Sequence, residues 1–180
     1  MNPLDIINKY YSPEREVYHI LVDHSRSVTN KALEIARNHP EMKLDLPFIE
    51  EAAMLHDIGI FLCDAPEIDC HGEHPYICHG YLGADLMRKE GYPRHALVCE
   101  RHTGMGLSLA IIIERNLPIP HRDMQPVSME EQLICFADKF FSKTKLDKEK
   151  PVDKIRQSLE KYGEEGVLRF DGWCKLFLGK

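Results

Sequence analysis

The chain of 180 residues lacks the features that would place it at a membrane or on nucleic acid. Its first residues show no basic segment followed by an apolar run, so no secretory signal is expected. No stretch approaches the roughly 20 apolar residues needed to cross a bilayer. The net charge of -6 disfavours a surface that coats nucleic acid. We therefore expect a cytoplasmic protein with neither a membrane nor a nucleic acid among its partners.

The sequence also has no CxxC pair, the arrangement expected of a zinc ribbon. A cytoplasmic protein keeps its thiols reduced by default. We therefore expect no disulfide framework from the cysteines, which are Cys63, Cys70, Cys78, Cys99, Cys135 and Cys174.

Alternating apolar and polar residues, the pattern of a half-buried strand, are scarce. Apolar residues recur instead at helical spacing along most of the chain, which predicts an all-α fold. The length suits one domain, over residues 1–180, with a core at about 15–145 and C-terminal helices at 151–178 packed on it. The expected helices cover residues 14–38, 47–59, 79–91, 93–102, 107–115, 128–141, 151–162 and 164–177.

Histidine is in surplus, with ten residues in 180. His24 lies four residues after Ile20 and four before Val28, so it continues an apolar helix face. His102 follows Val98 by the same interval. Other candidates fall in an apolar stripe or at an expected helix end. Together, the candidate metal ligands are His24, His56, Asp57, His79, His102 and Asp138.

A carboxylate such as Asp138 within an apolar stripe costs several kcal/mol unless a cation, a set of donors or a metal compensates its charge. Imidazole and carboxylate groups are the ligands that zinc, iron and manganese take in proteins. Six ligands exceed what one tetrahedral ion uses and suit two ions, with the central Asp57 as the bridge. For each residue taken alone, a hydrogen-bonded structural role is the alternative.

The ordered set of ligands resembles the HD superfamily of metal-dependent phosphohydrolases, in the subgroup with the HDIG form, over roughly residues 20–145. The segments HGYLGADLM around His79, RHTG around His102 and ADKF at Asp138 are similar to the family's. The resemblance implies a single HD-type helical bundle. It also implies a first metal held by His24, His56, Asp57 and Asp138. His79 and His102 resemble the pair that binuclear members add.

From this resemblance we expect hydrolysis of a phosphoester or phosphoanhydride in a nucleotide-like small molecule, by a metal-bridging hydroxide, with Asp57, His79 and His102 as catalytic residues. The cofactor would be two divalent or mixed-valent ions, with iron favoured over manganese, zinc or nickel. Ile60 replaces the lysine common in the cyclic-dinucleotide group, which disfavours cyclic di-GMP. The sequence gives no indication of the oligomeric state.

Basic residues near the ligands are candidates for binding the substrate phosphate, with ordinary surface charges as the alternative. The loop from Cys63 to Cys78 is interpreted as an active-site flap whose histidines contact phosphate or relay a proton. A second, structural zinc centre and an ordinary surface loop are the alternatives. The candidate substrate-binding residues are Arg101, Lys139, His71, His74, Arg122 and Lys143.

Two other functions fit the same ligand set. Some HD proteins with these six ligands are mixed-valent di-iron oxygenases, and dioxygen consumption would identify that chemistry. A non-catalytic module, in which the metal stabilises the fold or a nucleotide is sensed, is the second alternative. Retention of all six ligands disfavours it, since degenerate HD domains usually lose ligands.

Overall fold

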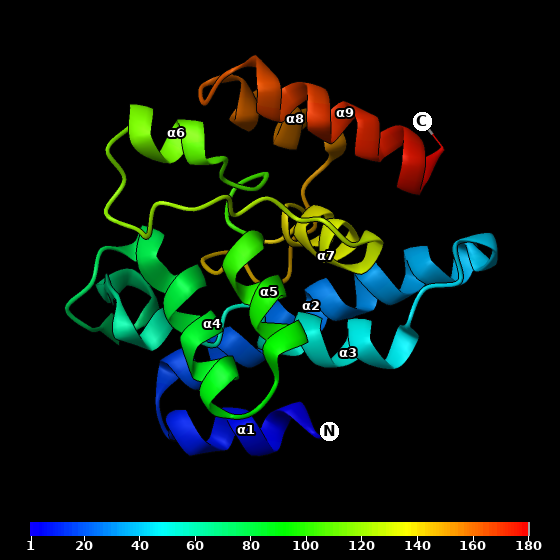
Figure 1. Ribbon diagram of the computed structural model, residues 1–180. Helices are drawn as coiled ribbons and strands as arrows, with labels where there is room; N and C mark the ends of the chain where they lie inside the picture. The colour runs from blue at the N-terminus through cyan, green and yellow to red at the C-terminus, as the bar shows by residue number, and fades with distance from the viewer. Residues whose placement is uncertain (180) are drawn as a thin grey trace.

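The structure is a computed structural model that describes residues 1–179, and nearly all of its regular secondary structure is helical (Figure 1). The expected all-α fold is confirmed. Within the described residues, the α-helices are α1 (Pro3–Tyr10), α2 (Glu16–Asn38), α3 (Leu46–Leu55), α4 (His79–Lys89), α5 (Pro93–Arg101), α6 (Leu109–Glu114), α7 (Met129–Asp138), α8 (Val152–Glu160) and α9 (Glu164–Leu178). Two short antiparallel strands, β1 (Asp64–Ala65) and β2 (Cys70–His71), pair with Asp64 opposite His71.

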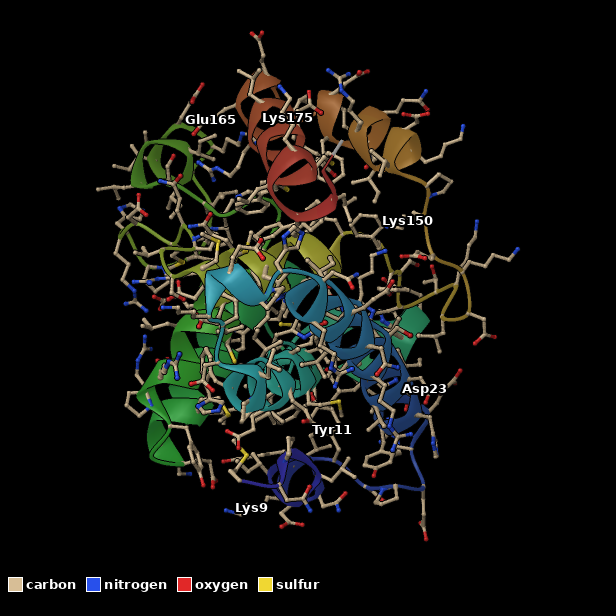
Figure 2. The ribbon with its side chains drawn as sticks, turned by 90° about the vertical axis from the view of Figure 1, so that its right-hand side faces the viewer. Lys9, Tyr11, Asp23, Lys150, Glu165 and Lys175 are labelled. Atoms are coloured by element: carbon tan, nitrogen blue, oxygen red, sulfur yellow. The ribbon has the colours of Figure 1, made fainter. Side chains whose placement is uncertain are left out.

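Helix α7 lies between two groups of helices, with α1 to α5 on one side and α6, α8 and α9 on the other (Figures 1 and 2). One apolar core joins α2 and α3 to α7 and α9. A second core joins α1 and the first half of α2 to α3, α4 and α5. Helices α2, α3 and α5 contribute to both cores.

The C-terminal helices are attached to the rest of the chain through aromatic packing. Phe136 on α7 lies with its ring centroid 5.6 Å from that of Phe170 and 5.4 Å from that of Phe177. Trp173 packs edge-on to the same ring at 6.3 Å. None of the helices in residues 1–179 combines the length and apolar character that crossing a bilayer requires.

The helix expected at 47–59 ends earlier, at Leu55, with His56 as its C-cap. We expected Gly59 to stop this helix, but the role of Gly59 is different. A Cβ on Gly59 would lie 2.4 Å from the carbonyl oxygen of His79 and 2.5 Å from the amide nitrogen of Gly83. Glycine is needed here because α4 packs directly against the backbone.

Helix α1 was not among the expected helices. It begins with Asn2, whose side chain accepts a hydrogen bond from the amide of Leu4, followed by Pro3. Ile6 and Ile7 are buried on its inner face. Directly after it, the Tyr11 hydroxyl donates a hydrogen bond of 2.7 Å to the carbonyl of Ile58, next to the candidate ligands. The N-terminal helix therefore supports the turn that carries His56 and Asp57.

Candidate metal centre

The structure brings together all six residues that the sequence singled out as metal ligands. They come from the middle of α2, the turn after α3, the first residue of α4, the C-cap of α5 and the last residue of α7. They form two groups, in each of which the potential ligand atoms lie within 4.8 Å of one another. The first group is His24, His56, Asp57 and Asp138, and the second is Asp57, His79 and His102.

Asp57 belongs to both groups and each of its oxygens faces one of them. Its Oδ2 lies 3.2 Å from His24 Nε2 and 3.0 Å from His56 Nε2. Its Oδ1 lies 3.3 Å from His79 Nε2 and 3.2 Å from His102 Nε2. This is the arrangement of a carboxylate that can serve two cations at once.

Asp138 completes the first group from α7. Its Oδ1 lies 3.0 Å from His24 Nε2 and 3.3 Å from His56 Nε2. Asp138 therefore shares with Asp57 the same pair of imidazoles. We expected the acidic residue in the apolar stripe of this helix to face other candidate ligands, and Asp138 does so.

Local helix geometry orients three of the four imidazoles. His56, His79 and His102 each sit where a helical turn ends, and each Nδ1 lies 2.6–2.7 Å from the backbone carbonyl three residues earlier. Carbonyls in the last turn of a helix are short of backbone donors, so an Nδ1–H group can bond to them. The Tyr76 carbonyl also accepts from the backbone amide of His79. The opposite nitrogen, Nε2, then faces the centre, as in a metal-binding histidine.

Tyr76 fixes His79 in a second way. Its ring stacks on the imidazole at a centroid distance of 4.5 Å, and its carbonyl is the one that accepts from Nδ1. Burial raises the pKa of the Tyr76 phenol, so this hydroxyl stays protonated at neutral pH. The loop before α4 thus positions a ligand through both its backbone and its side chain.

Several buried polar atoms at the centre are incompletely satisfied. His56 Nε2 and Asp57 Oδ1 are buried without a hydrogen-bond partner, and Asp57 Oδ2 has the Lys143 ammonium at 2.7 Å. Leaving such groups unsatisfied costs about 1–3 kcal/mol each, and more for a charged group. A divalent cation would accept these lone pairs, so the donor set fits a metal.

The charges at the centre are strongly coupled. Burial alone would raise the pKa of Asp57, but the His56 imidazole and the Lys143 ammonium hold it well below its usual range. Burial would likewise lower the pKa of His56, yet Asp57 and Asp138 raise it to about 10. For His102 burial prevails and lowers the pKa to about 4. The carboxylates thus remain ionised, which is the form that binds a cation.

Lysines lie on the open side of the centre. Lys143 Nζ is 2.7 Å from Asp57 Oδ2, and Lys139 Nζ is 3.0 Å from Asp138 Oδ2. A cavity of about 300 Å³ beside Asp138 is lined by both and by Lys150, which lies on the segment leading from α7 to α8 (Figure 2). Sequence reasoning named Lys139 and Lys143 but missed Lys150.

The two arginines predicted to bind the substrate, Arg101 and Arg122, do not reach the candidate ligands. Arg101 pairs with Glu131 at 2.9 Å, and Arg122 pairs with Glu100. Neither lines the cavities beside the ligands. Their charges are therefore compensated elsewhere in the fold.

The histidines of the loop before α4 also point elsewhere. His71 is exposed and its Nε2 lies 3.1 Å from Asp69, while the exposed His74 lines neither cavity. The loop does reach the ligands through Tyr76 and Ile77, which line the cavity at His79 and His102. The loop residues that border the candidate ligands are therefore Tyr76 and Ile77, and not His71 or His74 as expected.

The alternative of a zinc centre in this loop finds no support. Within residues 1–179, the groups of side chains that could hold a metal contain no cysteine. Cys63, Cys70 and Cys78 are free thiols, all buried. Burial raises the pKa of the Cys63 thiol to about 11 and that of Cys70 to about 12, so both stay protonated.

The fold and the clustered ligands define an all-α domain with a potential metal centre. The family model of the HD domain matches residues 21–142, a range that contains all six ligands. The chain belongs to the HD domain family. Members of this family bind divalent metals, and metal-dependent hydrolase-type activity is what membership implies.

Curated proteins include relatives of this chain. The uncharacterized protein MJ0778 of Methanocaldococcus jannaschii is 30% identical over 144 residues, which is 78% of this chain and 76% of that protein. The tRNA (cytidine(56)-2'-O)-methyltransferase of Picrophilus torridus is 25% identical over 149 residues, 82% of this chain but 37% of that enzyme. No solved structure matches the chain.

Proposed function

We propose that this protein is a metal-dependent phosphohydrolase of the binuclear, six-ligand HDIG type. It would cleave a phosphoester or phosphoanhydride bond in a small, nucleotide-like molecule. The observation that carries the proposal is the position of Asp57, with one carboxylate oxygen directed at each group of histidines. A lone structural aspartate would need only one set of partners.

Two ions would be held by residues that each have a defined place. His24, His56 and Asp138 would hold the first ion, and His79 and His102 the second, with Asp57 between them. Such ions, when bound, supply Lewis acidity and make water a nucleophile near neutral pH. Iron is favoured, with manganese, zinc or nickel as alternatives, since sites of this type accept several metals.

The lysines would bind the substrate and stabilise the charge that develops on it. Lys143, Lys139 and Lys150 line the cavity that opens beside Asp138. Burial would lower the pKa of Lys143, but the Asp57 carboxylate outweighs it and raises that pKa, so the ammonium group keeps its charge. Fixed positive charges near the transferred phosphoryl oxygens favour the transition state over the ground state. This cationic cavity supports a phosphate substrate.

The direct test is phosphate release from a panel of phosphoesters by protein loaded in turn with Fe²⁺, Mn²⁺, Zn²⁺ and Ni²⁺. Asp57→Ala should abolish release and reduce the bound metal, because both groups lose their shared carboxylate. Asp85→Ala is the matched control, since Asp85 is an exposed carboxylate on α4. Full activity in Asp57→Ala would rule the proposal out. Oxygen consumption in place of phosphate release would identify an oxygenase.

A second pair of variants tests the lysines. Lys143→Met should lower kcat/KM by about 10²-fold, the usual effect of removing one preorganised charge stabiliser. Lys145→Met, two residues along in the same loop and exposed, should leave kcat/KM unchanged. Equal effects of the two substitutions on kcat/KM would show that Lys143 does not bind the substrate phosphate.

A further inference from the structure

A separate cavity of about 390 Å³ lies between the loop at residues 103–108, helix α6 and the C-terminal helices. Its size falls within the range of small-molecule sites, near the lower end. Most of the wall area is apolar, and the polar side chains in the wall are Thr103, Ser108, Arg115, Tyr162, Glu165 and Arg169. The apolar residues that form it include Ile77, Met105, Leu107, Ile111, Leu117 and Leu159.

This apolar cavity adjoins a cavity at the candidate metal centre. A third cavity, of about 370 Å³, is lined by His79, His102 and Asp138. The two cavities share Ile77, Thr103 and Gly104 in their walls. A molecule whose phosphoryl group lies against the ligands could therefore extend past Ile77 and Thr103 into the apolar cavity.

The walls of the apolar cavity are held by arginines that bridge distant segments. Arg169 on α9 donates to the carbonyl of Met105 at 2.5 Å. Arg115, just after α6, donates to the carbonyl of Tyr162 at 2.6 Å. These two guanidinium groups join α9 to the loop at Met105, and the end of α6 to Tyr162. The cavity between these segments is therefore preformed. Leu159 and Gly166 in its wall lie outside residues 21–142, which the family model covers.

We propose that this cavity binds the organic part of the substrate, and that this part is an apolar group of one or two aromatic rings. The proposal rests on the proposed function for the placement of the phosphoryl group. An apolar protein cavity of about 150 Å³ holds benzene, so the volume here accommodates two fused rings. The cationic cavity beside Asp138 is less suitable for such a group because lysines line it.

Gly166 allows the cavity to be filled without disturbing the backbone. It lies near the start of α9 and lines the cavity, and a Cβ there would meet only Met105 Cγ, at 3.7 Å. Gly166→Trp should therefore fill the cavity with an indole. Gly172→Trp is the matched control, since Gly172 is exposed on the same helix and a Cβ there meets nothing within 4 Å. Gly166→Leu provides a smaller filling group if the tryptophan variant does not fold.

The kinetic test compares 1-naphthyl phosphate with methyl phosphate in metal-loaded protein. Gly166→Trp should raise KM for the naphthyl ester by about tenfold or more, equivalent to about 1.4 kcal/mol. It should leave KM for the methyl ester unchanged, and Gly172→Trp should resemble the wild type with both. Equal effects of Gly166→Trp on both esters, or no effect on either, would overturn the assignment.

A binding measurement separates this assignment from the proposed function. Calorimetry with 1-naphthylmethylphosphonate, which is not a phosphoester, should show binding to the wild type and to Gly172→Trp, and about tenfold weaker binding to Gly166→Trp. If this pattern holds while no phosphoester is hydrolysed, the cavity assignment stands and the proposed function fails. If phosphoesters are hydrolysed but Gly166→Trp binds the phosphonate as the wild type does, the assignment fails and the function stands.

Discussion

Replacing Gly59 by alanine should displace α4 and with it one half of the metal centre. The new Cβ would lie 2.4 Å from the His79 carbonyl oxygen and 2.5 Å from the Gly83 nitrogen, both of them backbone atoms. Ordinary contacts begin near 3.5 Å, so the helix must retreat by about 1 Å. Overpacking of this kind costs about 1–3 kcal/mol, and the upper end applies because backbone atoms cannot rotate away.

The displacement also has a functional consequence. His79 Nε2 lies 3.3 Å from Asp57 Oδ1, and a shift of α4 changes this distance directly. A misplacement of about 1 Å in a catalytic group can lower activity about 10²-fold. Urea unfolding measures the first effect, and metal content with phosphate release measures the second.

Gly172→Ala is the control for the substitution itself. Gly172 lies on an exposed helix face with open space around its Cα, so alanine there should be neutral or stabilise by up to about 1 kcal/mol. The prediction would be wrong if Gly59→Ala had the same urea midpoint as the wild type and bound the same amount of metal. Close packing of α4 against Gly59 would then not be what positions His79.

Two further substitutions test the supports of the site. Tyr11→Phe removes the donor to the buried Ile58 carbonyl and should lower the free energy of unfolding by about 1–3 kcal/mol, measured by urea titration; an unchanged midpoint would contradict this. Asp45 caps α3, and Asp45→Ala should cost about 1 kcal/mol at pH 7. Arg94 and the Phe48 amide lower the pKa of Asp45, so its contribution is complete above about pH 4 and disappears as pH falls through that lowered pKa. A difference that grew in acid would refute this sign.

The ligands could be predicted because the chemistry of burial constrains them. An aspartate such as Asp138 on an apolar face is costly unless something compensates its charge. His24 and His102 continue apolar stripes, so periodicity alone directs them inward. Which of these residues meet cannot be derived from periodicity, because it depends on how helices pack. The resemblance to a known family supplied that step.

Adjacency in sequence was a poor guide to the residues around the ligands. Arg101 precedes His102, but consecutive residues of a helix point about 100° apart, and its side chain turns to Glu131 instead. Lys150 lines the cavity beside Asp138 because the segment after α7 folds back, with the Lys150 amide donating to the Phe140 carbonyl at 2.8 Å. No local pattern in the sequence indicates that reversal.

Helix boundaries were also missed for identifiable reasons. Gly59 matched the pattern of a glycine that ends a helix. Glycine is needed at this position for another reason, which is that the backbone of α4 packs closely against it. The signals for α1 were present, since Asn2 and Pro3 form an N-cap followed by proline. A helix this short is stabilised mainly by tertiary packing, here of Ile6 and Ile7, and not by its own propensity.

The central claim is that Asp57 serves two cations, and metal stoichiometry tests it most directly. Calorimetric titration of metal-free protein with Mn²⁺, checked by elemental analysis, should give two ions per chain for the wild type. His79→Ala should retain one ion, because His24, His56, Asp57 and Asp138 remain together. Asp57→Ala should lose both. Two ions bound with wild-type affinity by Asp57→Ala would contradict the account.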